Sequence, residues 1–478
     1  MDQKRPLGWD KVIFTHVVII GIPAILYYFL RLGGQDLFLL HILVATMYLI
    51  TAIVIIAETV ISLFRRYAQP EEEPSGAFDR FFQHVKMAIG VSGAKHAAPT
   101  RPVPRSTFIV AAYLPNEQEI IIDTLQHLLT RVRRPADGLE VILAYNSPVE
   151  LPVETELRSL AARYPELRVM HVEESESKAD NLNAGIRAAT GEIVGILDAD
   201  HQPMPDCFEK AWRWLAADYD IVQGRNIIRN YDENAMTRMI AVEFECIYGI
   251  SHPARSLFVD TGIFGGSNGY WRKDVFEKVK FDPRMMTEDI DASSQALLEG
   301  YHIMHDRSIV STELAPHDFR SFWLQRKRWS QGWLEVSLKY QRRFWTTPFL
   351  SIWQKIYWTY LLMYRETYPA VTLQIFPIIL SLLLYQGYIP LTAHWFLWVT
   401  AIVTLLSGPF QTIVAIRTSL TGYSLWYTAG YGLFVFFYAI LKNMISVVAL
   451  YDNLLGRTDW VVTRRRMTER MKGMDREP

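Results

Sequence analysis

Two aspartates stand two positions apart directly after a short apolar run. Leu197 is followed by Asp198, Ala199 and Asp200, and His201 comes next. Carboxylates with this spacing at the end of a strand can bind one hard divalent cation and, through it, a diphosphate. Neutralising a departing diphosphate is the main requirement for moving a sugar off a nucleotide. An isolated Asp-x-Asp is more often a turn or a helix cap, so the rest of the sequence must decide.

A lysine and two asparagines begin a helical pattern 20 residues before the first aspartate. They are Lys178, Asn181 and Asn183. A lysine and amide groups at the start of a helix can bind phosphate oxygens or the edges of a base. Considered alone, the pattern favours a solvated lysine and a capping asparagine.

Acidic residues cluster after Pro283, where a helix is expected to start. Glu288, Asp289 and Asp291 fall within four residues. They can simply complement the positive end of the helix dipole. Alternatively, Asp289 is a general base, because transfer to a sugar hydroxyl needs a carboxylate within hydrogen-bond reach. Glu288 beside it would raise its pKa.

Cations and tryptophans alternate further along the chain. Gln325, Arg328 and Trp329 lie in one run, and Trp333 follows four residues later. Guanidinium groups stabilise a departing diphosphate, and indole faces stack on the apolar patch of a sugar ring. An amphipathic, membrane-proximal helix rich in arginine and tryptophan explains the run equally well.

Strand and helix patterns alternate in the region that contains the first two groups. This alternation predicts a mostly parallel α/β sheet, whose ligands gather at the carboxyl ends of its strands. The polar groups described above should therefore follow strands, as the aspartates do. The expected strands cover 107–112, 139–144, 167–172 and 192–197, and the expected helices cover 119–131 and 181–189.

The composition fits a large folded protein and excludes other classes. Of 478 residues, 50% are hydrophobic and 13% aromatic, so most of the chain should be ordered. A net charge of −1 gives no overall field that would recruit nucleic acid. The two cysteines, Cys207 and Cys246, cannot form a disulfide framework and suit a reducing compartment.

Long apolar segments flank the α/β region, and a bilayer span needs about 20 apolar residues. The segment 426–450 is apolar, but Lys442 and Asn443 would be costly at mid-bilayer, so we expect this segment at the membrane interface. The aromatic segment 351–364 is expected at the headgroup level. Four segments qualify as spans: 12–30, 37–63, 368–385 and 391–416.

Lysine and arginine set the expected orientation. Lys4, Arg5 and Lys11 precede the first span, and Arg65 and Arg66 follow the second, which places the N-terminus and the middle of the chain in the cytoplasm. The basic C-terminal tail is expected there too, which requires four spans rather than five. The predicted organisation, in the cell (inner or plasma) membrane, is a transmembrane hairpin (1–65), a cytoplasmic linker (66–104), a cytoplasmic catalytic domain (105–340), interfacial and transmembrane helices (341–450) and a cytoplasmic tail (451–478).

Taken together, these groups resemble a known family. Lys-Ala-x-Asn-Leu-Asn (178–183), Asp-Ala-Asp-His (198–201), Thr-Glu-Asp (287–289) and Gln-x-x-Arg-Trp (325–329) occur in the order of the processive family-2 glycosyltransferases. Over roughly 105–466 the chain is similar to the cellulose synthase, hyaluronan synthase and chitin synthase superfamily. The segment 456–465 resembles the gating loop that folds over the nucleotide in cellulose synthases and plant mannan-synthase-like enzymes.

The resemblance implies an α/β GT-A domain inserted between transmembrane helices, with Mg²⁺ or Mn²⁺ as cofactor and inversion at the anomeric carbon. It assigns the metal to Asp198 and Asp200 and the base to Asp289, assisted by Glu288. The loop 264–270 falls where the family holds its acceptor, although an ordinary tight turn also fits it. The implied acceptor-binding residues are Gly266, Ser267, Asn268, Tyr270, Trp329 and Trp333, and the implied donor-binding residues are Asn116, Glu117, Asn146, Lys178, Asn181, Asn183, Asp198, Gln325, Arg328, Thr463, Arg464 and Arg465.

The sequence departs from the family at the end of the second expected strand. The family usually has an aspartate pair there, where the base is read, whereas this chain has Ala144, Tyr145 and Asn146. Asn146 can pair with a base but carries no charge. Uridine is therefore the first expectation for the nucleotide and guanosine the second.

The expected function is transfer of a hexose from a nucleotide sugar to a growing β-linked polysaccharide, which is translocated through the protein's own membrane helices. The alternative is addition of one sugar to a membrane lipid, and a glycolipid would then be the acceptor. A catalytically silent scaffold is disfavoured by the intact carboxylates. Membrane lipids are expected partners, and so few spans for a channel favour an oligomer or a helper subunit. The sugar and the linkage depend on small contacts in the pocket and stay open.

Overall fold

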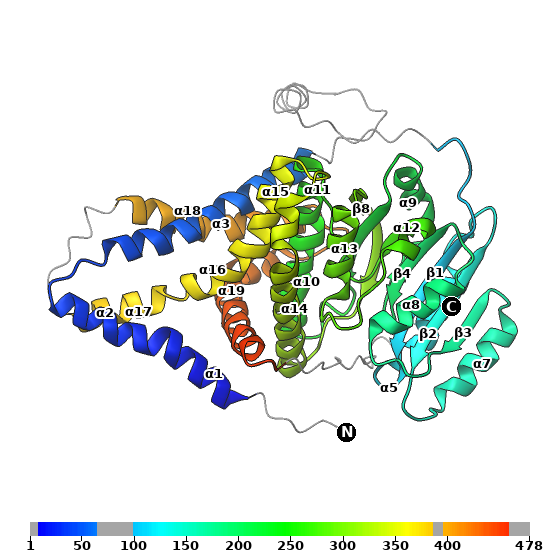
Figure 1. Cartoon of the computed structure of the whole chain (residues 1–478), viewed down its shortest axis with the longest axis horizontal. Helices are drawn as coiled ribbons and strands as arrows, with labels where there is room; N and C mark the ends of the chain where they lie inside the picture. Colours follow the sequence, from blue (N-terminus) through cyan, green and yellow to red (C-terminus); the bar gives the residue numbers. More distant parts are fainter. Residues whose placement is uncertain (1–7, 65–98, 386–394, 458–478) are drawn as a thin grey trace. The chain divides into compact units, whose positions relative to one another are not determined.

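The computed structural model describes residues 8–64, 99–385 and 395–457 (Figure 1). These residues form two compact units. Among the described residues, the helical unit contains 8–60, 322–341, 357–385 and 395–457, and the sheet unit contains 61–64, 99–321 and 342–356.

The sheet unit contains one sheet of eight strands in the order β3-β2-β1-β4-β7-β6-β8-β5. Neighbouring strands run parallel from β3 to β4 and between β6 and β8, whereas β7 is antiparallel to both β4 and β6. The predicted α/β class with a mostly parallel sheet is confirmed. The strands are β1 (Ser106–Tyr113), β2 (Leu139–Asn146), β3 (Leu167–His171), β4 (Ile193–Asp198), β5 (Gln202–Pro203), β6 (Ile221–Ile228), β7 (Gly269–Arg272) and β8 (Ile303–Glu313).

Helices cover both faces of this sheet. Phe108 and Val110 of β1 pack into a core with α6 and α9, whereas Ile109 between them faces α8. A Cβ at Gly185 of α8 would lie 2.6 Å from the side chain of Ile109, so glycine permits this close packing. Burial on both faces explains the continuous apolar runs of the central strands. The helices of this unit are α5 (Leu114–Glu117), α6 (Ile121–Thr130), α7 (Val153–Arg163), α8 (Lys178–Ala188), α9 (Cys207–Leu215), α10 (Ala235–Cys246), η3 (Ile247–Ser251), α11 (His252–Phe258), α12 (Lys273–Lys278) and α13 (Glu288–Leu298).

The reversed strand β7 decides what lies at one edge of the sheet. Because β7 is antiparallel to β4, the start of β7 lies at the end of β4 where Asp198 stands. The turn before β7, Gly265–Asn268, therefore reaches the edge at which the parallel strands place their carboxyl ends.

The helical unit is built from long apolar helices of the N- and C-terminal parts of the chain. Three helices, α3 (Phe38–Phe64), α14 (Phe319–Thr346) and α15 (Ile352–Thr359), contribute residues to both units. The remaining helices are α1 (Trp9–His16), η1 (Val17–Gly21), α2 (Ile22–Leu32), η4 (Tyr360–Tyr364), α16 (Arg365–Thr372), α17 (Ile375–Leu384), α18 (Trp395–Arg417) and α19 (Leu425–Leu454).

Within the described part of the chain, five helical runs are long and apolar enough to cross a membrane, which indicates a multi-pass membrane protein. The predicted segments 12–30, 37–63 and 391–416 correspond to three of them. The five runs are Trp9–Leu32, Phe38–Leu63, Ile352–Leu384, Trp395–Arg417 and Gly430–Leu454.

Two predictions about these helices differ from the structure or stay open. The expected interfacial segment 351–364 and the expected span 368–385 form one continuous run, because Arg365 between them is accommodated: its guanidinium lies 4.2 Å from the ring centroid of Trp333. The last run, Gly430–Leu454, has 25 residues and a mean hydropathy of 2.1, within the range of the other four. Its Asn443 donates to Thr372 Oγ1 at 3.2 Å, so one of the two polar groups that argued against a span has a partner. Its place at the interface remains a prediction.

Candidate functional site

Lys178 joins three of the predicted groups in the sheet unit. Ser177 caps α8, since its Oγ accepts from the backbone N–H of Asp180, and this fixes Lys178 as the first residue of the helix. The Lys178 ammonium lies 2.5 Å from Asp198 Oδ1 and 3.5 Å from Glu288 Oε1. It also donates to the carbonyl oxygen of Gly266 at 2.8 Å. Side chains from the predicted donor, metal and base groups therefore meet at one cation.

Asp289 lies beside this cation at the start of α13. Burial, reinforced by the neighbouring carboxylate of Glu288, raises the pKa of Asp289 to about 7, although Lys178 opposes the rise. Burial alone would lower the pKa of Lys178, but the carboxylates around it, above all that of Asp198, raise it above its ordinary value. The lysine is therefore charged, and the aspartate titrates near neutral pH. These are the protonation states that a cationic phosphate ligand and a general base require.

Gly266 lies in van der Waals range of the base. Its φ is +87°, and a Cβ at this position would lie 2.9 Å from Asp289 Oδ2. Glycine is therefore required here both by the backbone conformation and by the close approach of the carboxylate.

The predicted metal ligands form a group with a third residue. Ligand atoms of Asp198, Asp200 and His201 all lie within 4.8 Å of one another. Asp200 and His201 are buried, and Asp200 Oδ2 accepts from the backbone N–H of Leu314 at 3.1 Å. Two carboxylates with an imidazole beside them are a donor set that fits Mg²⁺ or Mn²⁺. We did not predict His201 as a ligand, although it directly follows the aspartate pair in sequence.

The residues predicted to bind the nucleotide fall into two places. Asn181 Nδ2 donates to Ala112 O at 3.1 Å and to Asn146 Oδ1 at 2.9 Å, so Asn146 and Asn181 meet at the ends of β1 and β2. Asn183 faces elsewhere, because its amide binds the backbone of Phe281.

Two further residues predicted to bind the nucleotide follow β1, on the short helix α5. Glu117 Oε2 accepts from the backbone N–H of Tyr113 at 2.9 Å, and Asn116 precedes it on the same helix. The structure therefore keeps Asn116 and Glu117 after β1, as predicted, and shows the Glu117 carboxylate bound to the chain itself.

Some side chains of the predicted acceptor segment point into the interior of the domain. Ser267 Oγ accepts from the backbone N–H of Asp198 at 2.9 Å, which ties the turn to the metal group. Asn268 is fully buried and donates to Arg225 O at 3.2 Å. Tyr270 is also fully buried, and its hydroxyl donates to Asn268 Oδ1. The backbone of Gly266 and the hydroxyl of Ser267 thus lie against the site, whereas the Asn268 and Tyr270 side chains are held in the interior.

The predicted Gln-x-x-Arg-Trp group lies on α14, in the helical unit. Gln325 Oε1 and Arg328 Nε are buried and have no hydrogen-bond partner among the described residues. Buried polar atoms normally have partners, so these two atoms leave hydrogen-bonding capacity that a ligand, a water molecule or another part of the chain can fill. Arg326 lies 4.1 Å from the ring centroid of Trp329, and Trp333 stacks with Arg365.

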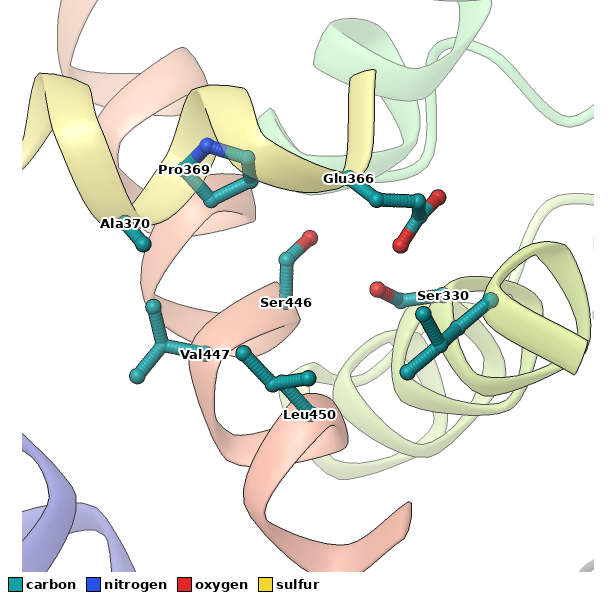
Figure 2. Close-up of a pocket in the computed structure, with 8 residues that line it drawn as sticks. Ser330, Glu366, Pro369, Ala370, Ser446, Val447 and Leu450 are labelled. Atoms are coloured by element: carbon teal, nitrogen blue, oxygen red, sulfur yellow. The ribbon is translucent and has the colours of Figure 1, made fainter. Parts of the chain in front are cut away.

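A pocket of the helical unit follows this group on α14 (Figure 2). Figure 2 shows the carboxylate of Glu366 and the hydroxyls of Ser330 and Ser446 pointing toward one another, with apolar side chains beside them. The sequence analysis did not single out these residues, because they come from three distant segments. The lining residues are Ser330, Leu334, Glu366, Pro369, Ala370, Ser446, Val447 and Leu450.

The buried carboxylate of Asp452, on α19, links α14 to α1. Asp452 Oδ1 lies 2.9 Å from Lys11 Nζ, and its other oxygen accepts from Lys327. Gln331 Nε2 donates to Arg457 O at 3.0 Å. The predicted donor-binding residues Thr463, Arg464 and Arg465 lie outside the described residues.

Part of the chain is similar in sequence to known proteins. Residues 107–280 match the family model "Glycosyl transferase family 2". The chain is 25% identical over 285 residues to "Glucomannan 4-beta-mannosyltransferase 1" of Oryza sativa subsp. japonica, a match that covers 57% of this chain and 51% of that protein. It is 28% identical over 248 residues to "Poly-beta-1,6-N-acetyl-D-glucosamine synthase" of Staphylococcus epidermidis, covering 50% and 57%.

The chain spans about half the length of these curated relatives. Among solved structures it is similar to the mannosyltransferase PcManGT from Pyrobaculum calidifontis in complex with GDP-Man and Mn²⁺. That likeness has a TM-score of 0.48 at 19% identity and covers 84% of this chain and 99% of that chain. Residues 107–280 are thus similar to glycosyl transferase family 2, and they lie in a GT-A-like domain that the sequence places between N-terminal and C-terminal apolar helices.

Proposed function

We propose that the protein is an inverting, metal-dependent transferase that moves a hexose from a nucleotide sugar, a UDP-sugar in preference to a GDP-sugar, to a growing β-linked polysaccharide. The polymer would leave through the protein's own membrane helices. The observation that carries the proposal is the junction at Lys178, where Asp198 of the metal group and Glu288 beside the base meet one ammonium. The names of two relatives, a glucomannan 4-beta-mannosyltransferase and a poly-beta-1,6-N-acetyl-D-glucosamine synthase, support a β-linked polymer as product.

In the proposed reaction, Asp289 takes the proton of the acceptor hydroxyl while the hydroxyl oxygen bonds to the anomeric carbon of the donor. The bond between that carbon and the phosphate oxygen breaks, and the nucleoside diphosphate leaves with the electron pair. A pKa of about 7 makes Asp289 a stronger proton acceptor than an ordinary aspartate while a large fraction stays deprotonated near neutral pH.

The leaving diphosphate needs positive charge, and two groups of the site can supply it. Asp198 and Asp200 would hold Mg²⁺ or Mn²⁺, which neutralises the diphosphate when bound. Lys178 adds a fixed cation beside Asp198, held by the Gly266 carbonyl. Because the lysine lies between the metal group and the base, it can contact the diphosphate at the point where the bond to the sugar breaks.

The remaining roles follow the family resemblance. We assign the nucleotide to Asn116, Glu117, Asn146 and Asn181, which stand at the ends of β1 and β2, and not to Asn183, whose amide binds the backbone of Phe281. The family resemblance assigns diphosphate binding to Gln325 and Arg328, each of which has a buried polar atom without a partner among the described residues. The tail residues Thr463, Arg464 and Arg465 would close over the donor. The acceptor is assigned to Gly266, Ser267, Trp329 and Trp333, whereas the buried side chains of Asn268 and Tyr270 would support the turn from inside.

The membrane helices support placement of the reaction at a membrane. Their number and apolar character fit a multi-pass protein of the inner or plasma membrane, and the positive charges around the first two spans favour a cytoplasmic domain and termini.

Purified full-length protein, supplied with Mn²⁺ or Mg²⁺ and a panel of radiolabelled UDP- and GDP-sugars in lipid nanodiscs, tests the proposal. We expect one sugar to be incorporated into long chains that a linkage-specific glycosidase degrades. Asp289→Asn protein prepared in parallel is the control for contaminating synthases. If only a single labelled lipid forms, the product is a glycolipid rather than a polysaccharide. If no sugar is transferred from any donor, the proposal is overturned.

A further inference from the structure

The turn Gly265–Asn268 touches each part of the catalytic group. The carbonyl of Gly266 accepts from Lys178 at 2.8 Å, and the Gly266 backbone lies against the carboxylate of Asp289. Ser267 Oγ accepts from the backbone N–H of Asp198. A shift of this turn would therefore move the lysine, the base and the end of β4 relative to one another.

The turn has few side-chain atoms that could fix its own conformation. Gly265 and Gly266 have no side chains, and Gly266 adopts a positive φ that favours glycine. Glycine loses more conformational freedom on folding than any other residue, so its conformation must be imposed by neighbours. A group of the sheet unit must therefore impose the conformation of this turn.

Gln223 of β6 binds both ends of this turn. Its side chain is fully buried, and its Oε1 accepts from the backbone N–H of Gly265 at 2.8 Å. Its Nε2 donates to Ser267 O at 2.9 Å and lies 3.3 Å from Asn268 O. One amide thus satisfies the first N–H of the turn and the carbonyls that follow Gly266.

We propose that Gln223 is a positioning residue: its buried amide clamps the Gly265–Asn268 turn and so holds Lys178 and Asp289 at the geometry for transfer. The catalytic consequence rests on the proposed function, whereas the clamp itself does not. The amide suits this task because it presents an acceptor and a donor side by side, matching one N–H and one carbonyl of the same turn. Loss of the amide would leave two buried backbone groups unpaired, and the turn would move to regain partners.

The test compares Gln223→Met, which keeps the length of the side chain and removes every hydrogen bond of the amide to the turn, with a matched control on the same sheet. Thr107→Val is that control. Thr107 is also fully buried, and its Oγ1 binds Glu140 and the backbone N–H of Gly191 at the opposite end of β1. Both substitutions remove buried hydrogen bonds from the sheet, but only Gln223→Met affects the turn.

Two readouts on the intact protein separate positioning from general destabilisation. Hydrogen exchange by mass spectrometry, without substrate, should show faster exchange in the peptides around Gly265 and Asp198 for Gln223→Met only. Steady-state kinetics should show kcat reduced at least tenfold with donor KM changed less than about threefold. Thr107→Val should lower the melting temperature and leave both readouts at the wild-type value. If Gln223→Met does not fold, Gln223→Glu, which retains the acceptor for Gly265, is measured in its place.

Unchanged exchange around Gly265, or an equal rise throughout the sheet, would overturn the clamp. Faster local exchange with unchanged kcat would overturn the positioning role. If the wild-type protein transfers no sugar at all, the proposed function fails, and the exchange experiment still decides whether Gln223 holds the turn.

Discussion

The ammonium nitrogen of Lys178 lies 2.5 Å from Oδ1 of Asp198, so the first aspartate of the metal group is also one half of an ion pair. A carboxylate has two oxygens and about four lone-pair sites, so it can serve a lysine and a cation at once. The Asp198 side chain is 33% exposed, which leaves it accessible to a ligand from solvent. The Lys178 side chain therefore links the charge of the metal group to that of the predicted base, Asp289.

Removal of either carboxylate of the metal group should abolish transfer while the fold persists. Asp198→Ala and Asp200→Ala each take away an oxygen ligand, and EDTA should have the same effect on the wild-type protein. Binding of Mn²⁺, followed by electron paramagnetic resonance, should weaken in both variants. Asp206→Ala, which removes a surface carboxylate paired with Lys210, is the control and should retain both metal and activity. Full activity in EDTA would exclude the metal from the mechanism.

Asp289→Asn keeps the size of the side chain and removes its ability to accept a proton. Turnover should fall by about 10²-fold or more, the usual scale of general-base catalysis, with donor binding largely kept. Since the pKa of Asp289 is about 7 and the base must be deprotonated, the wild-type rate should fall as the pH drops through that value. The variant should lose this dependence. If donor affinity collapsed while bound donor still reacted, Asp289 would be a donor ligand instead.

Asp452 should stabilise the helical unit through its two lysines. Asp452→Asn leaves Lys11 and Lys327 without their carboxylate, and hydrogen bonds to charged groups contribute about 1.5–3 kcal/mol each. We expect a clear drop in the unfolding midpoint in detergent. Glu150→Gln breaks an exposed pair with Arg158 and should change stability by less than about 1 kcal/mol. Equal midpoints for the two variants would show that the buried carboxylate adds nothing.

Thr463→Ala tests the predicted gating segment, which lies outside the described residues. A hydroxyl that closes over the donor would make this substitution lower the transfer rate although no charge changes. If the tail only anchors the chain at anionic lipid, replacement of Arg464 and Arg465 should matter and Thr463→Ala should not. A cysteine at position 463, labelled from the cytoplasmic side and protected by nucleotide, would support closure. Labelling only from outside would refute both the gating segment and the four-span topology.

The local pattern of the sequence predicted half of the sheet. The four expected strands lie within two residues of β1 to β4, because buried parallel strands carry short, continuous apolar runs. Helix α8 begins three residues before its predicted start, since the Ser177 capping box adds a turn that includes Lys178. The strands β5 to β8 were not predicted, because their pairing joins segments far apart in the chain and includes a reversed strand.

The candidate site was predictable in composition but not in contacts. Asp198, Asp200 and Asp289 stand after a strand or at a helix start, which local patterns reveal. The contact of Lys178 with Asp198 depends on which strands are neighbours, and local patterns do not specify that order. The engagement of Asn183 with Phe281 also depends on packing between α8 and the chain before α13. Amide side chains serve the backbone as readily as they serve a ligand, so residue type alone does not distinguish the two uses.

Because β7 is reversed, the position of the Gly265–Asn268 turn does not depend on the length of the chain segment that precedes it. Gly266 reaches the catalytic edge because β7 pairs with β4 on one side and β6 on the other, and this pairing fixes its register. The segment between Ile228 and Gly265, which holds α10, η3 and α11, does not set that register. Insertions or deletions within this excursion can therefore reshape the surroundings of an acceptor while the glycine keeps its place beside Asp289. Under the proposed function, this arrangement lets one catalytic group be combined with different acceptors.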